Sequence, residues 1–133
     1  MTYELTVTDN QMRVLEIALE SYFRVRLGQF GDLANDIAGL TAIDMQNEEF
    51  DRRISKRNAL KDALDSLYLF ATPKGLLTQR SDDARTAQDI WAVIRHERYM
   101  DRPKELRSSW CTAADKPLLI SDDPRVKVRR VDE

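Results

Sequence analysis

Residues 8–28 decide the fold and read TDNQMRVLEIALESYFRVRLG. Thr8 is a typical helix N-cap, because its hydroxyl can accept a hydrogen bond from a free backbone N–H, and Gln11 completes a capping box. Gly28 ends the pattern well, because glycine adopts the left-handed conformation that follows a helix at little cost. The apolar residues between them recur at helical spacing: Met12, Leu15, Ala18, Leu19, Tyr22 and Val25. The stretch therefore predicts an amphipathic helix over residues 9–27.

Two more stretches after this helix carry helical periodicity. Residues 29–40 have an apolar edge that predicts a short second helix. Residues 48–71 predict a long third helix, which Pro73 and Gly75 end. One face of the third helix is expected to collect its apolar residues: Phe50, Ile54, Leu60, Leu64, Leu67 and Ala71. Residues 41–47 show neither the period of a helix nor the alternation of a strand.

A fourth helix is expected over residues 82–100. Ser81 is a suitable N-cap, two aspartates follow it in the first turn, and Pro103 prevents continuation. Its apolar positions again share a face: Ala84, Ala87, Ile90, Trp91 and Ile94. The fourth helix is therefore expected to face the core along its length.

The two ends of the chain carry strand signals instead. Residues 3–7 alternate apolar and polar side chains, and residues 117–120 and 126–128 could form short strands. We therefore predict a mainly α fold, a compact bundle of about four helices with one to three short strands near the termini. Residues 1–133 are expected to form one domain, with a loose tail from residue 122.

Composition narrows the classes of function. The 133 residues carry a net charge of −2, so nothing in the balance indicates a nucleic-acid partner. No apolar run is long enough to span a membrane, and the first residues lack the features of a signal peptide, so we expect a cytoplasmic protein. Cys111 is the single cysteine, which excludes an intrachain disulfide and fits a reducing compartment.

The fourth helix carries the residues that most suggest chemistry. Asp89 and His96 lie seven residues apart and so near one helix face, Arg95 precedes His96, and Ala92 leaves space between them. Together a carboxylate, an imidazole and a guanidinium could bind an anion. The alternative is a surface ladder in which Arg85 pairs with Asp89 at i,i+4.

The end of the first helix supplies three more candidates. Arg24 can pair with Glu20, as a cation near a helix C-terminus, or it can contact a ligand. Arg26 extends the apolar stripe, so it needs an anion from the same chain, from a second subunit or from a ligand phosphate. Gln29 carries both a donor and an acceptor, with which it could read a base edge.

Two blocks of the sequence resemble a family of small uncharacterised phage and prophage proteins. The first is ALESYFRVRLGQF, residues 18–30, and the second is ARTAQDIWAVIRH, residues 84–96, followed by Asp101 and Arg102. The PLLIS segment from Pro117 resembles the closing segment of that family. This chain departs from the family pattern at Arg26, where the family tends to have Gly, and at Gln88, where it tends to have Tyr. The resemblance implies a phage or prophage origin and no particular activity.

No nucleophile elbow, phosphate loop, paired-cysteine motif or spaced metal-ligand cluster is present in the sequence. We therefore expect a non-enzymatic phage accessory protein, without cofactor or metal, that binds a host component. The sharpest form of this hypothesis is sequestration of a small anionic signalling nucleotide to counter host defence. The expected ligand-binding residues are Arg24, Gln29, Asp89, Arg95, His96 and Arg102.

Two alternatives to this hypothesis remain open at this point. One is a structural or protein-interaction module of phage assembly, and another is a hydrolase that uses Asp89 and His96. We also expect a homo-oligomer if the apolar faces of the helices are larger than one core can bury. Aromatic residues dominate such interfaces, so the expected anchors are Trp91, Tyr99 and Trp110.

Overall fold

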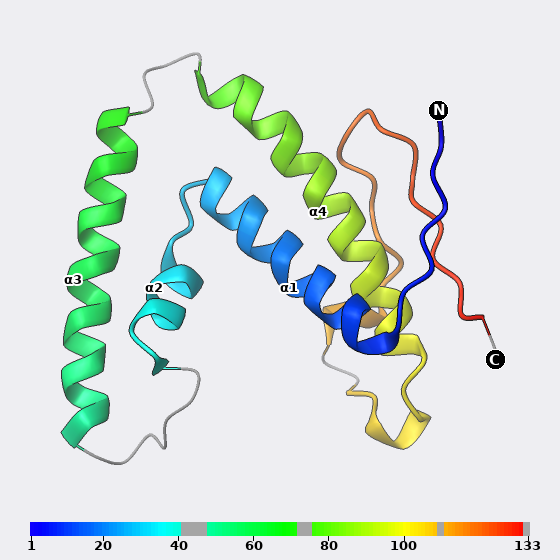
Figure 1. Ribbon diagram of the computed structural model, residues 1–133, viewed down its shortest axis with the longest axis horizontal. Helices are drawn as coiled ribbons and strands as arrows, with labels where there is room; N and C mark the ends of the chain where they lie inside the picture. Colours follow the sequence, from blue (N-terminus) through cyan, green and yellow to red (C-terminus); the bar gives the residue numbers. More distant parts are fainter. Residues whose placement is uncertain (41–47, 72–75, 109–110, 132–133) are drawn as a thin grey trace. The chain divides into compact units, whose positions relative to one another are not determined.

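The structure is a computed structural model that describes residues 1–40, 48–71, 76–108 and 111–131 (Figure 1). Its helices are α1 (Asp9–Arg26), α2 (Gly31–Ile37), α3 (Glu48–Ala71), α4 (Leu76–Met100) and the 3-10 helices η2 (Lys104–Leu106) and η3 (Thr112–Ala114). The chain forms two compact units: unit 1 comprises residues 1–23 and 85–133, and unit 2 comprises residues 24–84. The single domain and the loose tail from residue 122 stay predictions.

The four α-helices confirm the mainly α fold. The ends of α1 and α3 agree closely with the sequence patterns, whereas α2 is shorter than the predicted residues 29–40. The expected start of the fourth helix was wrong, because α4 begins at Leu76 and Ser81 lies inside it. The residues from Leu76 to Arg80 include leucine, glutamine and arginine, which are good helix formers, so the helix extends past the capping signal.

The short strands predicted near the termini are not present in the part of the chain that the structure describes. Residues 3–7, 117–120 and 126–128 are assigned neither helix nor strand. A period of two is a local signal, but a strand also needs a neighbouring backbone with which to pair. The predicted strands fail here because these segments find no such backbone within the described residues.

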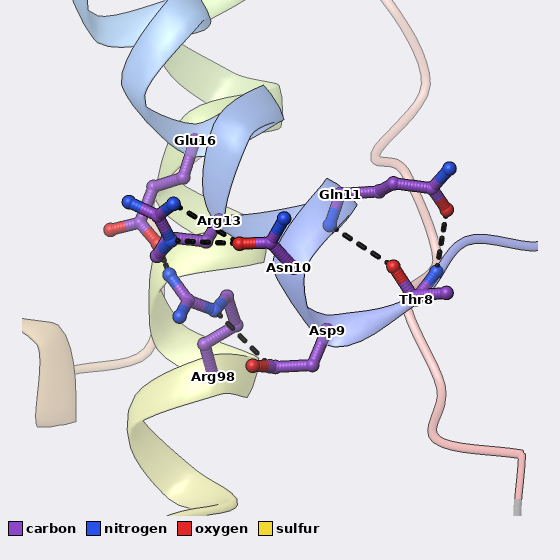
Figure 2. Close-up of polar contacts among 7 residues, drawn as sticks. All are labelled: Thr8, Asp9, Asn10, Gln11, Arg13, Glu16 and Arg98. Atoms are coloured by element: carbon purple, nitrogen blue, oxygen red, sulfur yellow. Dashed lines mark hydrogen bonds and ion pairs between the residues drawn. The ribbon is translucent and has the colours of Figure 1, made fainter.

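Unit 1 begins with the predicted capping box. The backbone N–H of Gln11 donates to Thr8 Oγ1 over 3.2 Å, and the N–H of Thr8 donates to Gln11 Oε1 over 2.8 Å (Figure 2). Its aromatic core lies between α1 and α4, where the rings of Phe23 and Trp91 meet edge to face at 5.3 Å. The buried apolar residues of unit 1 are Phe23, Ala87, Val93, Ile94, Tyr99 and Ala113.

Arg98 ties α4 to the first half of α1. Its Nη1 lies 2.5 Å from Glu16 Oε2, and its Nε lies 3.6 Å from Asp9 Oδ1 (Figure 2). The Arg98 and Glu16 side chains are only 22% and 21% exposed, so solvent screens this pair less than a surface pair. Removing the guanidinium would leave a partly buried carboxylate without its counter-charge.

Unit 2 is organised around the turn that follows α1. Gly28 adopts a φ of +75°, which L-residues with a side chain rarely take. A Cβ at Gly28 would also lie 2.7 Å from Cε1 of Tyr68, whose hydroxyl donates to the carbonyl of Arg26. The ring of Phe30 meets the same Tyr68 ring edge to face at 5.6 Å. Gly28 therefore ends the helix, as predicted, and also admits the aromatic pair.

Arginines of α3 hold the short helix α2 and the turn after it. Arg57 donates to Asn35 Oδ1 over 2.8 Å, and Arg53 donates to the carbonyl of Gly39 over 3.2 Å. Arg53 also forms an i,i+4 ion pair with Glu49, and this hydrogen bond lowers the pKa of the Glu49 carboxyl. Arg53 and Arg57 of α3 therefore both form hydrogen bonds that connect elements within unit 2.

Three large side chains of the predicted apolar stripes are exposed instead. Tyr22, Ile37 and Leu67 are 43%, 64% and 63% exposed, whereas Phe23 is buried and Tyr68 is partly buried. Phe23 follows Tyr22 and Tyr68 follows Leu67, so each of these rings lies about 100° around the helix from the side chain that was expected to face the core.

No helix within the described ranges is long and apolar enough to cross a membrane.

Arg98→Ala is expected to lower the free energy of unfolding by about 1–3 kcal/mol, because Glu16 loses its partner in a half-buried position. Urea denaturation followed by circular dichroism measures this change. Arg85→Ala is the matched control on the same helix, since Arg85 is exposed, and its effect should stay within about 0.5 kcal/mol. Equal effects of the two substitutions would contradict the assigned role of Arg98.

Candidate functional site

Unit 1 contains a hollow of ≈ 290 Å³ between α4 and the segment that follows η2. Helix α4 lines it with Gln88, Asp89, Ala92 and Arg95, which lie on one helix face at successive turns. The segment from Thr112 to Ile120 lines the opposite side. The small side chain of Ala92 leaves the space over this face that the sequence predicted.

Asp89 holds the far segment against α4. Its side chain is 7% exposed, and its two carboxylate oxygens accept the backbone N–H groups of Ile120 and Ser121, each over 2.9 Å. The hydroxyl of Ser121 donates to the same carboxylate. Hydrogen bonds to a carboxylate are stronger than those between neutral groups. Asp89 therefore sets the wall of the hollow, a role that the sequence did not suggest.

His96 fixes the other end of the same segment. Its Nδ1 lies 2.8 Å from the carbonyl oxygen of Ala113 in η3. A carbonyl oxygen can only accept, so Nδ1 carries the hydrogen in this contact. The residue does not line the hollow, although the neighbouring Ala113 does. His96 thus positions the wall, and the direct contact with an anion that the sequence predicted for it stays a prediction.

Arg95 is the cation that faces the hollow. Its guanidinium lies 5.0 Å from the centre of the Trp91 ring and donates to Thr112 Oγ1 over 3.2 Å. A weaker contact of 3.9 Å reaches the sulfur of Cys111. No carboxylate of the described residues forms an ion pair with Arg95. The charge is therefore held in place by neutral groups and an aromatic face, and it has no anionic partner there.

Other polar groups near Arg95 share this lack of a partner. The indole N–H of Trp91 is buried and has no acceptor among the described residues. Lys116 lines the hollow, is exposed, and pairs with no carboxylate in the described ranges. Asp89 and Asp115 also line the hollow, so its two cations are matched in number by two carboxylates. The site therefore presents two cations, of which only Arg95 is held in a defined direction.

Arg102 lies apart from the hollow. It is exposed, and its guanidinium lies 5.8 Å from the centre of the Tyr99 ring. Tyr99 itself is buried, and its hydroxyl donates to the carbonyl of Ser108, so the residue packs in the interior of unit 1. Trp91 likewise packs within unit 1, and the third expected interface anchor, Trp110, lies outside the described residues.

Arg24 and Gln29 belong to unit 2. The Nε of Arg24 lies 3.1 Å from Asp32 Oδ2, and its Nη1 donates to Gln29 Oε1 over 3.1 Å. Arg24 therefore has a carboxylate nearby, namely Asp32 of α2. A single ligand site that unites these two residues with Asp89, Arg95, His96 and Arg102 stays a prediction.

Arg26 has a partner within the chain. Its Nη2 lies 3.3 Å from Asp83 Oδ2, and the two side chains are 31% and 66% exposed. The sequence left open whether the anion comes from the chain, a second subunit or a ligand. The contact with Asp83 supplies the first of these.

Sequence reasoning missed Thr112 and Lys116. Both follow the fourth helix by a dozen or more residues, and no local pattern places them opposite Arg95. Their position depends on Asp89 and His96, which bind backbone groups far along the chain. The described residues hold no group of three or more histidine, cysteine, aspartate and glutamate side chains that could bind a metal ion.

Comparison of the chain with family models, with curated proteins and with solved structures finds no match in any of the three. The resemblance to phage and prophage proteins therefore stays a prediction that rests on its two sequence blocks. The chemistry of the hollow rests on its geometry alone.

Asp89→Ala is expected to release residues 117–121 from α4, because two backbone N–H groups lose their acceptor. Amide hydrogen exchange at Ile120 and Ser121 should accelerate at least tenfold, and the free energy of unfolding should fall by about 1–3 kcal/mol. Asp115→Ala, at an exposed carboxylate of the same hollow, is the control and should change neither. Unchanged protection in Asp89→Ala would refute the anchoring role.

Proposed function

We propose that this protein is a non-enzymatic binding protein that holds a small anionic ligand in the hollow of unit 1. In the most specific form of the proposal, that ligand is a nucleotide phosphate. The observation that carries the proposal is Arg95, a cation that lines the hollow without a carboxylate partner among the described residues. Its direction is already set by Trp91 and Thr112.

A guanidinium in this setting suits a phosphate. Its planar fork can donate two parallel hydrogen bonds to phosphate oxygens, and such charge-assisted pairs are strong. Because Arg95 stacks on Trp91, less side-chain entropy is lost when the ligand binds. Lys116 adds a second positive charge at the exposed rim of the hollow. A flexible ammonium group attracts an anion but does little to orient it.

The remaining lining suits the body of a nucleotide. Ala92, Pro117 and Leu118 contribute apolar surface, and Gln88 supplies an amide that can both donate and accept. The volume of ≈ 290 Å³ lies just below the usual range of small-molecule sites, roughly 300–1,000 Å³. The hollow is therefore sized for one small ligand rather than for a polymer.

The hydrolase alternative would use Asp89 and His96, and both side chains already hold the wall of the hollow. The carboxylate of Asp89 already accepts from Ile120 and Ser121, so it is poorly placed to act as a general base. The Nδ1 of His96 is engaged by Ala113. The hydrolase alternative would have to free the Asp89 carboxylate from these contacts, whereas His96 would act through its other ring nitrogen, Nε2.

In a phage, a protein of this kind would act by sequestration. A binding protein made in excess lowers the free concentration of a host signalling nucleotide without converting it. The phage origin comes from the resemblance of residues 18–30 and 84–96, and the choice of nucleotide from the position of Arg95 and the size of the hollow. Both belong to the proposal.

Titration calorimetry against a panel of nucleoside mono-, di- and cyclic phosphates tests the proposal. Arg95→Ala is expected to weaken the best ligand by about 10- to 100-fold, because a hydrogen bond to a charged group contributes about 1.5–3 kcal/mol. Lys116→Ala should weaken it less. The bound nucleotide should be recovered chemically intact after prolonged incubation.

Two controls make the outcome decisive. Arg85→Ala removes an exposed cation from the same helix outside the hollow and should leave affinity unchanged. Arg24→Ala tests whether unit 2 also contributes to binding, as the sequence predicted. No binding across the panel, or equal affinity in Arg95→Ala and wild type, would defeat the proposal.

A further inference from the structure

The hollow of unit 1 has two chemically different ends. At one end, Arg95 of α4 donates to Thr112 on the opposite wall over 3.2 Å. At the other end, Asp89 accepts the backbone N–H of Ile120 over 2.9 Å, and Gln88 lies beside it in the helix. The wall therefore runs antiparallel to α4. Because Gln88 and Arg95 are seven residues apart, about 10 Å of helix separates the two ends.

The span between Gln88 and Arg95 suits a nucleoside monophosphate. In such a molecule a similar distance separates the phosphate from the far edge of the base. When the phosphate binds the Arg95 guanidinium, the base lies at Gln88. A second phosphate would lengthen the ligand, so that the terminal phosphate and the base could not reach both ends together. Selection among nucleotides at Gln88 rests on the proposed function, which supplies the phosphate at Arg95.

Apolar side chains beside the far end of the hollow are uncovered. Leu118 and Ile120 line the hollow and are 82% and 45% exposed. Large exposed apolar groups are unfavourable in water, and the flat face of a nucleobase would cover them. Ala92 leaves room for such a ring beside the helix. A purine covers more of this surface than a pyrimidine does, because its ring system is larger.

Gln88 is the polar group that can read the edge of the base. Its side chain is half-buried, lines the hollow and has no hydrogen-bond partner among the described residues. Its amide presents a donor and an acceptor side by side. This pair matches the amino group of adenine and the ring nitrogen next to it, which is the bidentate contact that glutamine makes with adenine in nucleic acids.

The strongest contacts to guanine need groups that the far end does not offer. Two adjacent N–H groups of guanine suit a carboxylate, but the oxygens of Asp89 already accept from Ile120 and Ser121. Two adjacent acceptors on another edge of guanine suit an arginine, and Arg95 lies at the other end of the hollow. The free amide of Gln88 therefore favours adenine.

We propose that the ligand of the hollow is an adenosine monophosphate, with its phosphate at Arg95 and its base at Gln88. The open and the cyclic monophosphate share this chemistry. Arg95 binds the phosphate that every nucleotide carries, whereas Gln88 distinguishes the base and is thus a specificity-determining residue.

Titration calorimetry with adenosine, guanosine and uridine monophosphates tests the proposal, with cyclic adenosine monophosphate in a parallel titration to identify the preferred form. Wild type is expected to bind adenosine monophosphate at least tenfold more tightly than guanosine monophosphate, because one bidentate contact distinguishes bases by about that factor. Gln88→Glu replaces the donor of the amide with an acceptor, which opposes the ring nitrogen of adenine and suits the two N–H groups of guanine. This variant should reverse the preference.

Lys116→Ala is the charge-matched control. It removes a positive charge from the hollow, whereas Gln88→Glu adds a negative charge, so both make the hollow more negative by the same amount. The control should weaken both purine nucleotides equally and leave the ratio of their affinities unchanged. Ribose phosphate, which lacks the base, should bind at least tenfold more weakly than adenosine monophosphate.

The outcomes separate this proposal from the proposed function. Equal affinity for all nucleotides and ribose phosphate, while Arg95→Ala weakens every one, would overturn the role of Gln88 and leave the proposed function standing. An unchanged preference in Gln88→Glu would also overturn that role. Tighter binding of adenosine diphosphate would overturn the assignment of a single phosphate. The absence of any nucleotide binding would overturn both proposals together.

Discussion

The hydrogen bonds from the amides of Ile120 and Ser121 to Asp89 are the contact on which unit 1 depends. The segment after η2 has little regular structure, so its backbone groups need acceptors and donors from elsewhere. Side chains of α4 supply them at successive turns, with Asp89 at one end and His96 at the other. The hollow exists because these contacts hold a segment of irregular backbone at a fixed distance from a helix.

Local signals could be predicted from the sequence where the cause is also local. Thr8 and Gln11 cap α1 because the two groups lie within one turn of each other, and Gly28 ends it because its φ is positive. The helical content of the chain follows from the same kind of pattern. The start of α4 was predicted too late, because Ser81 can serve a helix interior as well as a cap.

The site could be predicted only in part. Arg95 and the space over Ala92 follow from positions on one helix, but the partners of Asp89 lie about thirty residues along the chain, and nothing local indicates them. The strand signal at residues 3–7 shows the converse. Alternation is encoded within the segment, whereas pairing requires a second backbone that the described part of one chain does not provide.

Gly28 and Tyr68 have a consequence for how this sequence can change over evolutionary time. The ring lies where a side chain at position 28 would begin, and the backbone there has a positive φ. A residue other than glycine can be accommodated only if the ring at position 68 shifts or is replaced by a smaller side chain, and asparagine is the type that tolerates such a backbone best. Among divergent homologues, the residue types at positions 28 and 68 are therefore expected to change together, although the two positions lie forty residues apart in the sequence.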